Sequence, residues 1–237
     1  MKIITWNCNM AFRKKINLIS ELRPDIAVVP ECEHPDRLRF DLFTQKPTDV
    51  LWHGDNHSKG LGVFSFGANK FTLLDNHNKG LKTILPISIT GGKVDFILFA
   101  IWANNTTDKK SQYIGQVWKA IHYYEGLLNE KVILTGDFNS NTIWDNQHRQ
   151  ANHSAVVKKL EEKRIYSAYH IFYKQEQGKE QHPTFFTYRH KDKPYHIDYC
   201  FASDYFISRL KEVQVGSYEQ WTRHSDHKPV IVTFDLA

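Results

Sequence analysis

The stretch "VILTGDFNSN", residues 132–141, passes from a buried strand into a polar turn within ten positions. Four apolar or β-branched residues lead into Gly136, and the carboxylate of Asp137 and the amide of Asn139 follow two positions apart. Glycine, aspartate and asparagine are ordinary turn formers, so this stretch alone fits either a simple turn or a functional strand end. The other strand ends of the chain distinguish between these interpretations.

Polar residues also end the first two predicted strands. In "IITWNCN", Asn7 and Asn9 lie on one face of the strand terminus, because side chains alternate with a period of two. In "IAVVPECE", Glu31 closes a nearly all-apolar strand. A turn cap would account for Asn7, and a salt bridge at the rim would account for Glu31, so neither residue is decisive alone.

The last two predicted strands carry polar residues as well. "YHIDYCF" sets Asp198 inside an apolar strand, where a lone carboxylate is costly unless it is paired or bound to a metal. "TRHSDHKPVIVTF" places Asp226 and His227 just before the final strand. Each again has a plain structural interpretation, either as a satisfied core carboxylate or as a turn before a proline.

Taken together, these polar strand ends favour a functional site. A β-sandwich collects strand ends at one edge, so the side chains have the opportunity to converge there. Carboxylates and amides without cysteine ligands suit a hard, oxygen-preferring cation such as Mg²⁺ or Mn²⁺. Cys8, Cys32 and Cys200 lie close to these positions in the sequence, and buried core thiols are favoured over a zinc site.

The apolar segments predict the fold class. A regular alternation of strands and helices does not fit their order, and so many strands need two sheets to cover both faces. We predict one domain over residues 1–237, built as a two-sheet sandwich flanked by helices. The predicted strands are 2–7, 25–31, 61–66, 82–89, 94–102, 131–137, 196–202 and 229–234, and the predicted helices are 12–22, 113–128 and 156–160.

Two similar segments, "DNHSKGL" at 55–61 and "DNHNKGL" at 75–81, each precede an apolar strand. A catalytic interpretation of His57 and His77 is open, but Asn and Gly in both copies favour a pair of turns.

Composition limits the partners and the location. The chain has 31 Lys and Arg against 26 Asp and Glu, which permits a polyanionic partner without requiring one. The amino terminus lacks the continuous apolar centre of a secretory signal. The apolar run "FILFAIWA" is far shorter than the roughly 18 residues of a membrane span. We therefore expect a cytoplasmic protein that does not associate with membranes.

The motifs "WNCN", "PE", "GDFN", "HIDY" and "SDHKP", in this order across nearly the whole chain, resemble the endonuclease/exonuclease/phosphatase superfamily. That superfamily includes DNA nucleases, sphingomyelinases, inositol polyphosphate 5-phosphatases and deadenylases. The resemblance implies a four-layer α/β sandwich, with two packed and mainly antiparallel β-sheets flanked by helices. All branches share these motifs, so they indicate the fold strongly and the substrate weakly.

The resemblance also implies roles for the residues that would bind metal and phosphate. Glu31 resembles the principal ligand of the Mg²⁺ or Mn²⁺ ion, and Asp226 resembles a carboxylate that helps to hold it. Asn7 and Asn139 match amides that orient the phosphate or nearby ligands, and Asn9 is a possible helper.

Three further residues match the catalytic positions of the superfamily. Asp137 matches the residue that positions or deprotonates the attacking water. Asp198 matches the carboxylate that orients a histidine, which is His227 in this chain. A buried carboxylate beside His227 favours the charged imidazolium, which suits it to stabilise the transferring phosphoryl oxygens.

The chain departs from the superfamily pattern at Trp102. Many members have a histidine or tyrosine at this point that touches the phosphate, whereas an indole donates one N–H and cannot shuttle a proton. Trp102, followed by Asn104, is therefore a candidate for packing against substrate, or simply a rim aromatic. Tyr195, three residues before Asp198, matches an aromatic that forms a sugar pocket in abasic-site endonucleases.

These observations lead to a functional hypothesis and two alternatives. We expect a metal-dependent phosphodiester hydrolase, a monomeric nuclease acting on DNA or RNA. A phosphatase or phosphodiesterase acting on small molecules or lipid headgroups is the first alternative. A catalytically inactive binding module on the same fold is the second, although such a module has no need of the complete set of polar strand ends.

Overall fold

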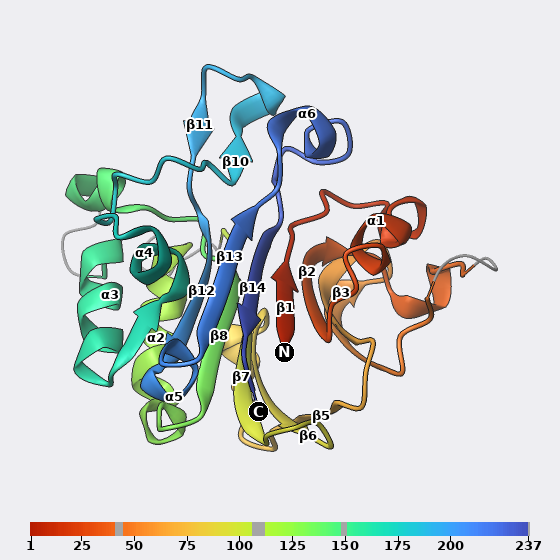
Figure 1. Cartoon of the computed structure of the whole chain (residues 1–237), viewed down its shortest axis with the longest axis horizontal. Coiled ribbons are helices and arrows are strands. Elements are labelled where there is room, and N and C mark those ends of the chain that lie inside the picture. The colour runs from red at the N-terminus through yellow and green to blue at the C-terminus, as the bar shows by residue number, and fades with distance from the viewer. Residues whose placement is uncertain (41–44, 106–111, 148–150, 237) are drawn as a thin grey trace.

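The structure is a computed structural model that describes residues 1–40, 45–105, 112–147 and 151–236. Two six-stranded sheets dominate it (Figure 1). The first sheet has the order β13-β14-β1-β2-β4-β3. Its strands are β1 (Lys2–Thr5), β2 (Ile26–Cys32), β3 (Asp49–Asn56), β4 (Lys59–Ser65), β13 (Leu210–Val215) and β14 (Val230–Phe234).

The second sheet has the order β5-β6-β7-β8-β12-β9. In each sheet one central pair is parallel, β1 with β2 and β7 with β8, and the other pairs are antiparallel. The strands of this sheet are β5 (Lys70–Leu73), β6 (Ile84–Thr90), β7 (Phe96–Trp102), β8 (Val132–Asp137), β9 (Ile165–Ser167) and β12 (Asp198–Ser203). A separate short hairpin pairs β10 (Phe185–Phe186) with β11 (Pro194–Tyr195).

Helices cover the outer faces of the sheets. Helices α2 and α3 pack over the second sheet, and α1 with its preceding 3-10 turn packs over the first (Figure 1). The α-helices are α1 (Ile16–Ser20), α2 (Ile114–Tyr123), α3 (His153–Glu162), α4 (Ala168–Tyr173), α5 (Asp204–Ile207) and α6 (Tyr218–Trp221). The 3-10 helices are η1 (Phe12–Lys14), η2 (Pro35–Arg37), η3 (Lys79–Leu81), η5 (Glu125–Leu127), η6 (Thr142–Gln147) and η7 (Thr187–Arg189).

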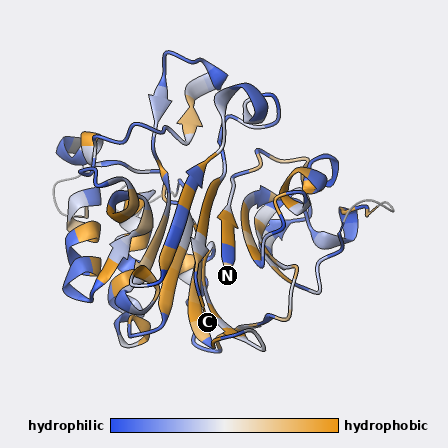
Figure 2. Ribbon diagram, in the orientation of Figure 1, coloured by the Kyte–Doolittle hydropathy of each residue, from blue (hydrophilic) through white to orange (hydrophobic). Residues whose placement is uncertain are grey.

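Alternating side chains of the inner strands supply separate hydrophobic layers. In β2, Ile26 and Val28 enter the core between the sheets, while Ala27 and Val29 enter the core beneath α1. An inner strand of a four-layer sandwich is therefore buried on both faces, which explains why it reads as a continuous apolar run (Figure 2).

The predicted four-layer α/β sandwich with two mainly antiparallel sheets is confirmed. All eight predicted strands exist, and they are the inner strands of the two sheets. The prediction missed the four edge strands, β3, β5, β9 and β13, and the two short strands of the β10–β11 hairpin. Strand β5 alternates between exposed and half-buried residues and β13 is mostly exposed, so neither has the apolar run on which the prediction depended.

The predicted helices and turns agree with the structure in part. The helix predicted over residues 12–22 divides into η1 and α1, because Lys15 between them has a non-helical backbone. Each "DNH" segment contains a turn: residues 57 and 58 form the tip of the β3–β4 hairpin, and residues 75 and 76 turn before η3. No helix in the described part of the chain combines the length and apolarity that crossing a lipid bilayer requires.

Strand direction brings the polar strand ends to one edge of the sandwich. Strands β1, β2 and β8 end there, and the antiparallel neighbours β12 and β14 begin there. Two side-chain hydrogen bonds join the sheets at this edge, from Asn7 Nδ2 to Asp137 Oδ2 at 2.9 Å and between His227 Nδ1 and Asp198 Oδ2 at 2.9 Å. The β10–β11 hairpin projects from the same edge (Figure 1).

Strands β7 and β8 approach each other closely at Gly136, and a substitution there tests how much stability depends on this approach. The φ of Gly136 is 147°, and a Cβ at this position would overlap the backbone oxygen of Ile101. We expect Gly136→Ala to lower the free energy of unfolding by about 2–3 kcal/mol or more, measured by denaturant unfolding. Gly126→Ala is the control, because a Cβ at Gly126 meets nothing within 4 Å. Equal stability of both variants would contradict this account.

Candidate active site

Asp137 lies at the centre of the polar edge. It is the last residue of β8 and is completely buried. Its Oδ2 accepts hydrogen bonds from the side-chain amides of Asn7 at 2.9 Å and Asn139 at 3.1 Å, and its Oδ1 accepts from the Asn139 backbone N–H at 2.9 Å. Asn139 adopts a left-handed backbone with φ of 47°, which folds "GDFN" back onto its own aspartate.

Asp198 faces Asp137 across the β8–β12 ladder, where the two are direct pairing partners. Asp198 is fully buried, and its Oδ2 binds Nδ1 of His227, which is 5% exposed. Its other oxygen, Oδ1, is buried with no hydrogen-bond partner in the structure. Two carboxylates and one imidazole thus form one buried group, with ligand atoms within 4.8 Å of one another.

This grouping shifts the protonation of its members. Burial raises the pKa of Asp137 to about 7, and the charge of Asp198 adds to the shift, although His227 opposes it. Burial alone would lower the pKa of His227, but the carboxylates of Asp198 and Asp137 outweigh it and raise the pKa to about 10. At neutral pH the site therefore holds an imidazolium beside a carboxyl group whose pKa is raised by burial and by Asp198.

Glu31 reaches the site through a β-bulge. The register of β2 against β4 shifts between Pro30 and Cys32, and Glu31 between them has φ of 62°. Its Oε1 accepts a hydrogen bond from Asn7 Nδ2 at 3.3 Å, and its Oε2 lies 3.0 Å from the ammonium of Lys59. A left-handed glutamate is strained, so the bulge holds this carboxylate in a costly conformation that aims it into the site.

Asp226 enters from the loop before β14. Its Oδ1 accepts from Asn9 Nδ2 at 3.0 Å, and Asn9 in turn donates its backbone N–H to Asn7 Oδ1 at 3.0 Å. Ser225, fully buried, donates its hydroxyl to the backbone oxygen of Asn7 at 2.7 Å and accepts from the His227 N–H at 3.0 Å. The loop of "SDHKP" is therefore fixed to the end of β1.

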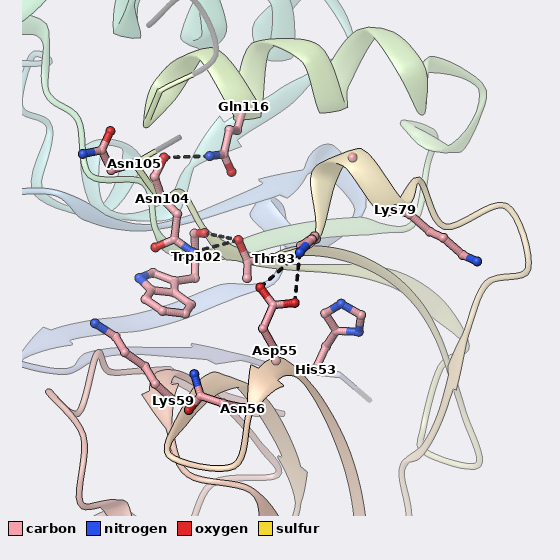
Figure 3. A pocket seen from close by; sticks show the side chains of 13 residues that line it. His53, Asp55, Asn56, Lys59, Lys79, Thr83, Trp102, Asn104, Asn105 and Gln116 are labelled. Carbon is pink, nitrogen blue, oxygen red and sulfur yellow. Dashed lines mark hydrogen bonds and ion pairs between the residues drawn. The ribbon is translucent and has the colours of Figure 1, made fainter. Parts of the chain in front are cut away.

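Trp102 is the direct ladder partner of Asp137 on β7 and is 8% exposed. It lines an open cavity of about 600 Å³ beside the site, together with Asn104, Lys59 and Lys82 (Figure 3). Asn104 donates its side-chain amide to Thr83 Oγ1 at 3.1 Å and accepts from Gln116 Nε2 on its backbone oxygen at 2.6 Å. Asn104 thus supports the cavity wall.

A row of aromatic rings borders the other side of His227. Phe185 lies 4.7 Å from His227 between ring centroids, and Tyr195 stacks on Phe185 at 6.3 Å with 28° between the planes. Trp144 lies 4.9 Å from Tyr195. All three are half-buried, and we call this row of rings, which begins with Phe185 against His227, the aromatic wall.

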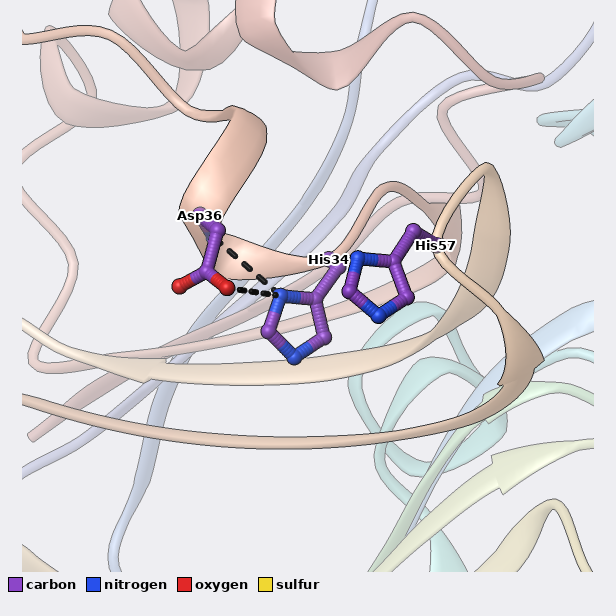
Figure 4. A group of neighbouring side chains, drawn as sticks. All are labelled: His34, Asp36 and His57. Carbon is purple, nitrogen blue, oxygen red and sulfur yellow. Dashed lines mark hydrogen bonds and ion pairs between the residues drawn. The ribbon is translucent and has the colours of Figure 1, made fainter.

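A second group of possible ligands, His34, Asp36 and His57, lies at the β3–β4 hairpin (Figure 4). The two imidazoles stack with centroids 4.3 Å apart and 18° between their planes. In-plane lone pairs of nearly parallel rings do not point at one ion, so this arrangement is not a formed metal centre.

The three cysteines are buried and free, which confirms their prediction as core thiols. Burial raises the pKa of Cys200 to about 12, so its thiol stays protonated and unavailable to a metal.

The site fits a divalent cation. Its free donors are carboxylate and amide oxygens, and a buried carboxylate oxygen of Asp198 has no partner. The Lys59 ammonium already occupies a cation position beside Glu31. His227 is a poor ligand while it is protonated, because an imidazolium has no free lone pair. Glu31 and Asp226, the carboxylates predicted to hold metal, are not part of the Asp137, Asp198 and His227 group.

A family model described as the endonuclease/exonuclease/phosphatase family matches residues 4–227. The chain belongs to this family. Its members depend on divalent metal ions, and the protein is a metal-dependent phosphodiester hydrolase. No curated protein matches the chain significantly.

Solved structures share the fold. An abasic-site (AP) endonuclease from Archaeoglobus fulgidus superposes with a TM-score of 0.71 at 18% identity, with 99% of both chains covered. The 3′-5′ exonuclease NExo from Neisseria meningitidis gives 0.66 at 21%, covering 99% of this chain and 100% of its own. A variant of the Neisseria 3′ phosphatase NExo, bound to a product DNA hairpin, gives 0.66 at 21%, with 99% of both chains covered.

The sequence-predicted residues meet at this edge, and the structure adds others that the prediction missed. Lys59 lies in a segment interpreted as a turn, and only the pairing of β4 with β2 reveals that it faces Glu31. Phe185 lies in a short strand whose aromatic residues are typical of ordinary sheet packing, and Trp144 has no signal in the sequence. Ser225 lies within a quoted motif, but its role as a bridge between β1 and β14 depends on the fold.

The raised pKa of His227 is testable in protein held free of metal by a chelator. The pKa of His227 is 6.5 in the unfolded chain and about 10 in the folded protein, so binding of this proton stabilises the fold. The stabilisation has its full value below pH 6.5 and is lost as the pH rises through about 10. We expect its imidazole to titrate near pH 10 by NMR, and Asp198→Asn to lower that pKa. The resonance is assigned with His227→Gln. An ordinary midpoint in the wild type would contradict the charge assignment.

Proposed function

We propose that the protein is a Mg²⁺- or Mn²⁺-dependent nuclease that hydrolyses phosphodiester bonds in DNA. The observation that carries this proposal is the meeting of Asp137, Asp198 and His227 in one buried group beside the strained Glu31. A scaffold protein gains nothing from two facing buried carboxylates, whereas phosphoryl transfer needs a group that positions or deprotonates the nucleophile and positive charge beside the phosphate.

In this proposal Asp137 accepts the proton of the attacking water. A pKa of about 7 places its carboxylate where a general base works best near neutral pH. Its three hydrogen bonds use three of about four acceptor positions, leaving one for water. The water oxygen forms the new bond to phosphorus, the bond to the leaving oxygen breaks, and that oxygen departs as an alkoxide that takes a proton from solvent. Asn139 and Asn7 hold the base in place.

His227 acts from the opposite side. Its Nδ1 is engaged by Asp198, so Nε2 is the nitrogen that donates to a phosphoryl oxygen. The imidazolium charge offsets negative charge that grows on the phosphate as it reacts. Asp198 acts through His227, as the group that fixes the ring and keeps it charged.

A bound divalent ion would supply positive charge that neutralises the phosphate and would make the attacking water easier to deprotonate. We assign Glu31 and Asp226 as the residues that hold it, with Asn7 and Asn9 fixing the two carboxylates. The choice of Mg²⁺ or Mn²⁺ follows from the oxygen donors alone.

Support for nucleic acid comes from the surroundings of the site and from related structures. The aromatic wall of Phe185, Tyr195 and Trp144 suits stacking against a sugar or base. The net charge of +5 suits a polyanion. The names of the related structures refer to an AP endonuclease, a 3′-5′ exonuclease and a DNA hairpin product, which favours DNA over RNA as the first substrate to test.

The metal and substrate are tested together. Labelled single-stranded, duplex and abasic-site DNA should be cut with Mg²⁺ or Mn²⁺, not with EDTA, and binding should weaken steeply with salt. RNA, sphingomyelin, inositol phosphates and phosphomonoesters serve as comparison substrates. If RNA were turned over faster than DNA, we would conclude that RNA is the preferred substrate. Intact oligonucleotides beside rapid turnover of a smaller substrate would overturn the nuclease assignment, and full activity in EDTA would overturn the metal.

The role of Asp137 is tested with a matched control. Asp137→Asn should lower kcat about 10²- to 10⁴-fold, because the base is lost. It should also lower stability by about 1–3 kcal/mol, because the new amide meets the Asn7 donor. Thr135→Val, on the same strand, also loses a buried hydrogen bond, to the Tyr199 oxygen, and should keep its kcat. Similar kcat values for Asp137→Asn and Thr135→Val would remove Asp137 from catalysis.

A further inference from the structure

Trp102 occupies a position at which the site lacks a proton-bearing or charged contact to phosphate. It is the ladder partner of Asp137, so its side chain rises beside the reacting centre. An indole offers one weak donor and no charge there. A neighbouring residue that brings a cation to the same place would restore the missing interaction.

Lys59 brings such a cation. Its Nζ lies 5.1 Å from the centre of the Trp102 ring and 3.0 Å from Glu31 Oε2. Its side chain keeps 38% of its surface exposed and lines the open cavity beside Trp102 (Figure 3). Lys59 is therefore held between a carboxylate and an aromatic face, at the mouth of the site.

Two irregularities in strand pairing place Lys59 in this position. The β2–β4 register shifts at Glu31, and the β3–β4 register shifts between His53 and Asn56, just before the hairpin tip. These shifts aim Glu31 and Lys59 at one another. An ion pair this exposed contributes only about 0–1 kcal/mol to stability, so stability alone gives little reason for the arrangement.

We propose that Lys59 binds a non-bridging oxygen of the scissile phosphate, in place of the histidine or tyrosine contact that Trp102 cannot provide. An ammonium has three N–H donors, so one can remain on Glu31 while another turns to the phosphate. Trp102 holds the lysine stem and head in position through its ring face. The inference rests on the proposed phosphodiesterase function, and no bond to Lys59 forms or breaks.

The first experiment measures turnover. Lys59→Met should lower kcat/KM about a hundredfold on DNA and on bis(4-nitrophenyl) phosphate, which has the same two non-bridging oxygens. Lys59→Arg should recover part of the loss, because it keeps the charge. The control is Lys163→Met, because Lys163 pairs with Glu125 at 2.9 Å, is similarly exposed at 32% and does not line this cavity, so the variant should stay within about twofold of wild type. If the wild-type enzyme cleaved bis(4-nitrophenyl) phosphate but not DNA, the nuclease proposal would be refuted. The role of Lys59 would still be tested by the activity of its variants on the small diester.

The second experiment locates the contact. DNA binding is measured by fluorescence anisotropy in Ca²⁺, with the scissile phosphate replaced by either stereoisomer of an uncharged methylphosphonate. Lys59→Met should weaken binding of normal DNA about tenfold or more, and weaken binding of one stereoisomer less than twofold. An equal loss on both stereoisomers and on normal DNA would overturn the proposal.

The third measurement distinguishes a direct contact between Lys59 and the phosphate from an effect of Lys59 on metal binding. Mn²⁺ affinity, measured by calorimetry, should be unchanged or tighter in Lys59→Met, because the ammonium no longer competes for Glu31. Weaker Mn²⁺ binding, with turnover restored to wild type by excess Mn²⁺, would show that Lys59 acts only through the metal and would overturn the proposal.

Discussion

Two buried carboxylates that face each other across β8 and β12 impose the main constraint on this protein. Asp137 and Asp198 are direct ladder partners with no exposed surface, and like charges so placed are unfavourable without compensation. His227 supplies that compensation from the opposite sheet, and the amides of Asn7 and Asn139 supply the remaining hydrogen bonds to Asp137. The edge where the sheets meet is therefore held by polar contacts as well as by apolar packing.

Backbone irregularities at the same edge serve these contacts. Asn9, Glu31 and Asn139 all have positive φ, a conformation that asparagine tolerates and glutamate does not favour. Gly136 lets β8 approach Ile101 more closely than any side chain would permit. The strain is concentrated where side chains must converge, while the strands below keep regular pairing and dry, alternating cores. A rigid sandwich with a strained rim is a good support for chemistry that depends on position.

Two different surfaces flank the buried carboxylates. A cationic cavity with Lys59 and Trp102 lies on one side of the carboxylates, and the aromatic wall next to His227 lies on the other. Family membership accounts for the central carboxylates and the imidazole, whereas these two flanks lie outside the shared motifs. In the proposed function they are the surfaces that would contact the rest of the substrate.

The sequence by itself determined the inner architecture and the members of the polar centre. All eight inner strands were predictable because burial on both faces makes them continuous apolar runs, and the polar residues interrupting those runs marked the site. The four edge strands were not predictable, since half-exposed strands such as β5 and β13 need no such run. Tertiary structure alone decided that Lys59 meets Glu31, that Ser225 joins β14 to Asn7, and that Asp198 lies opposite Asp137. Each of these depends on strand register and bulges, which are set by pairing between distant segments and leave no local pattern in the chain.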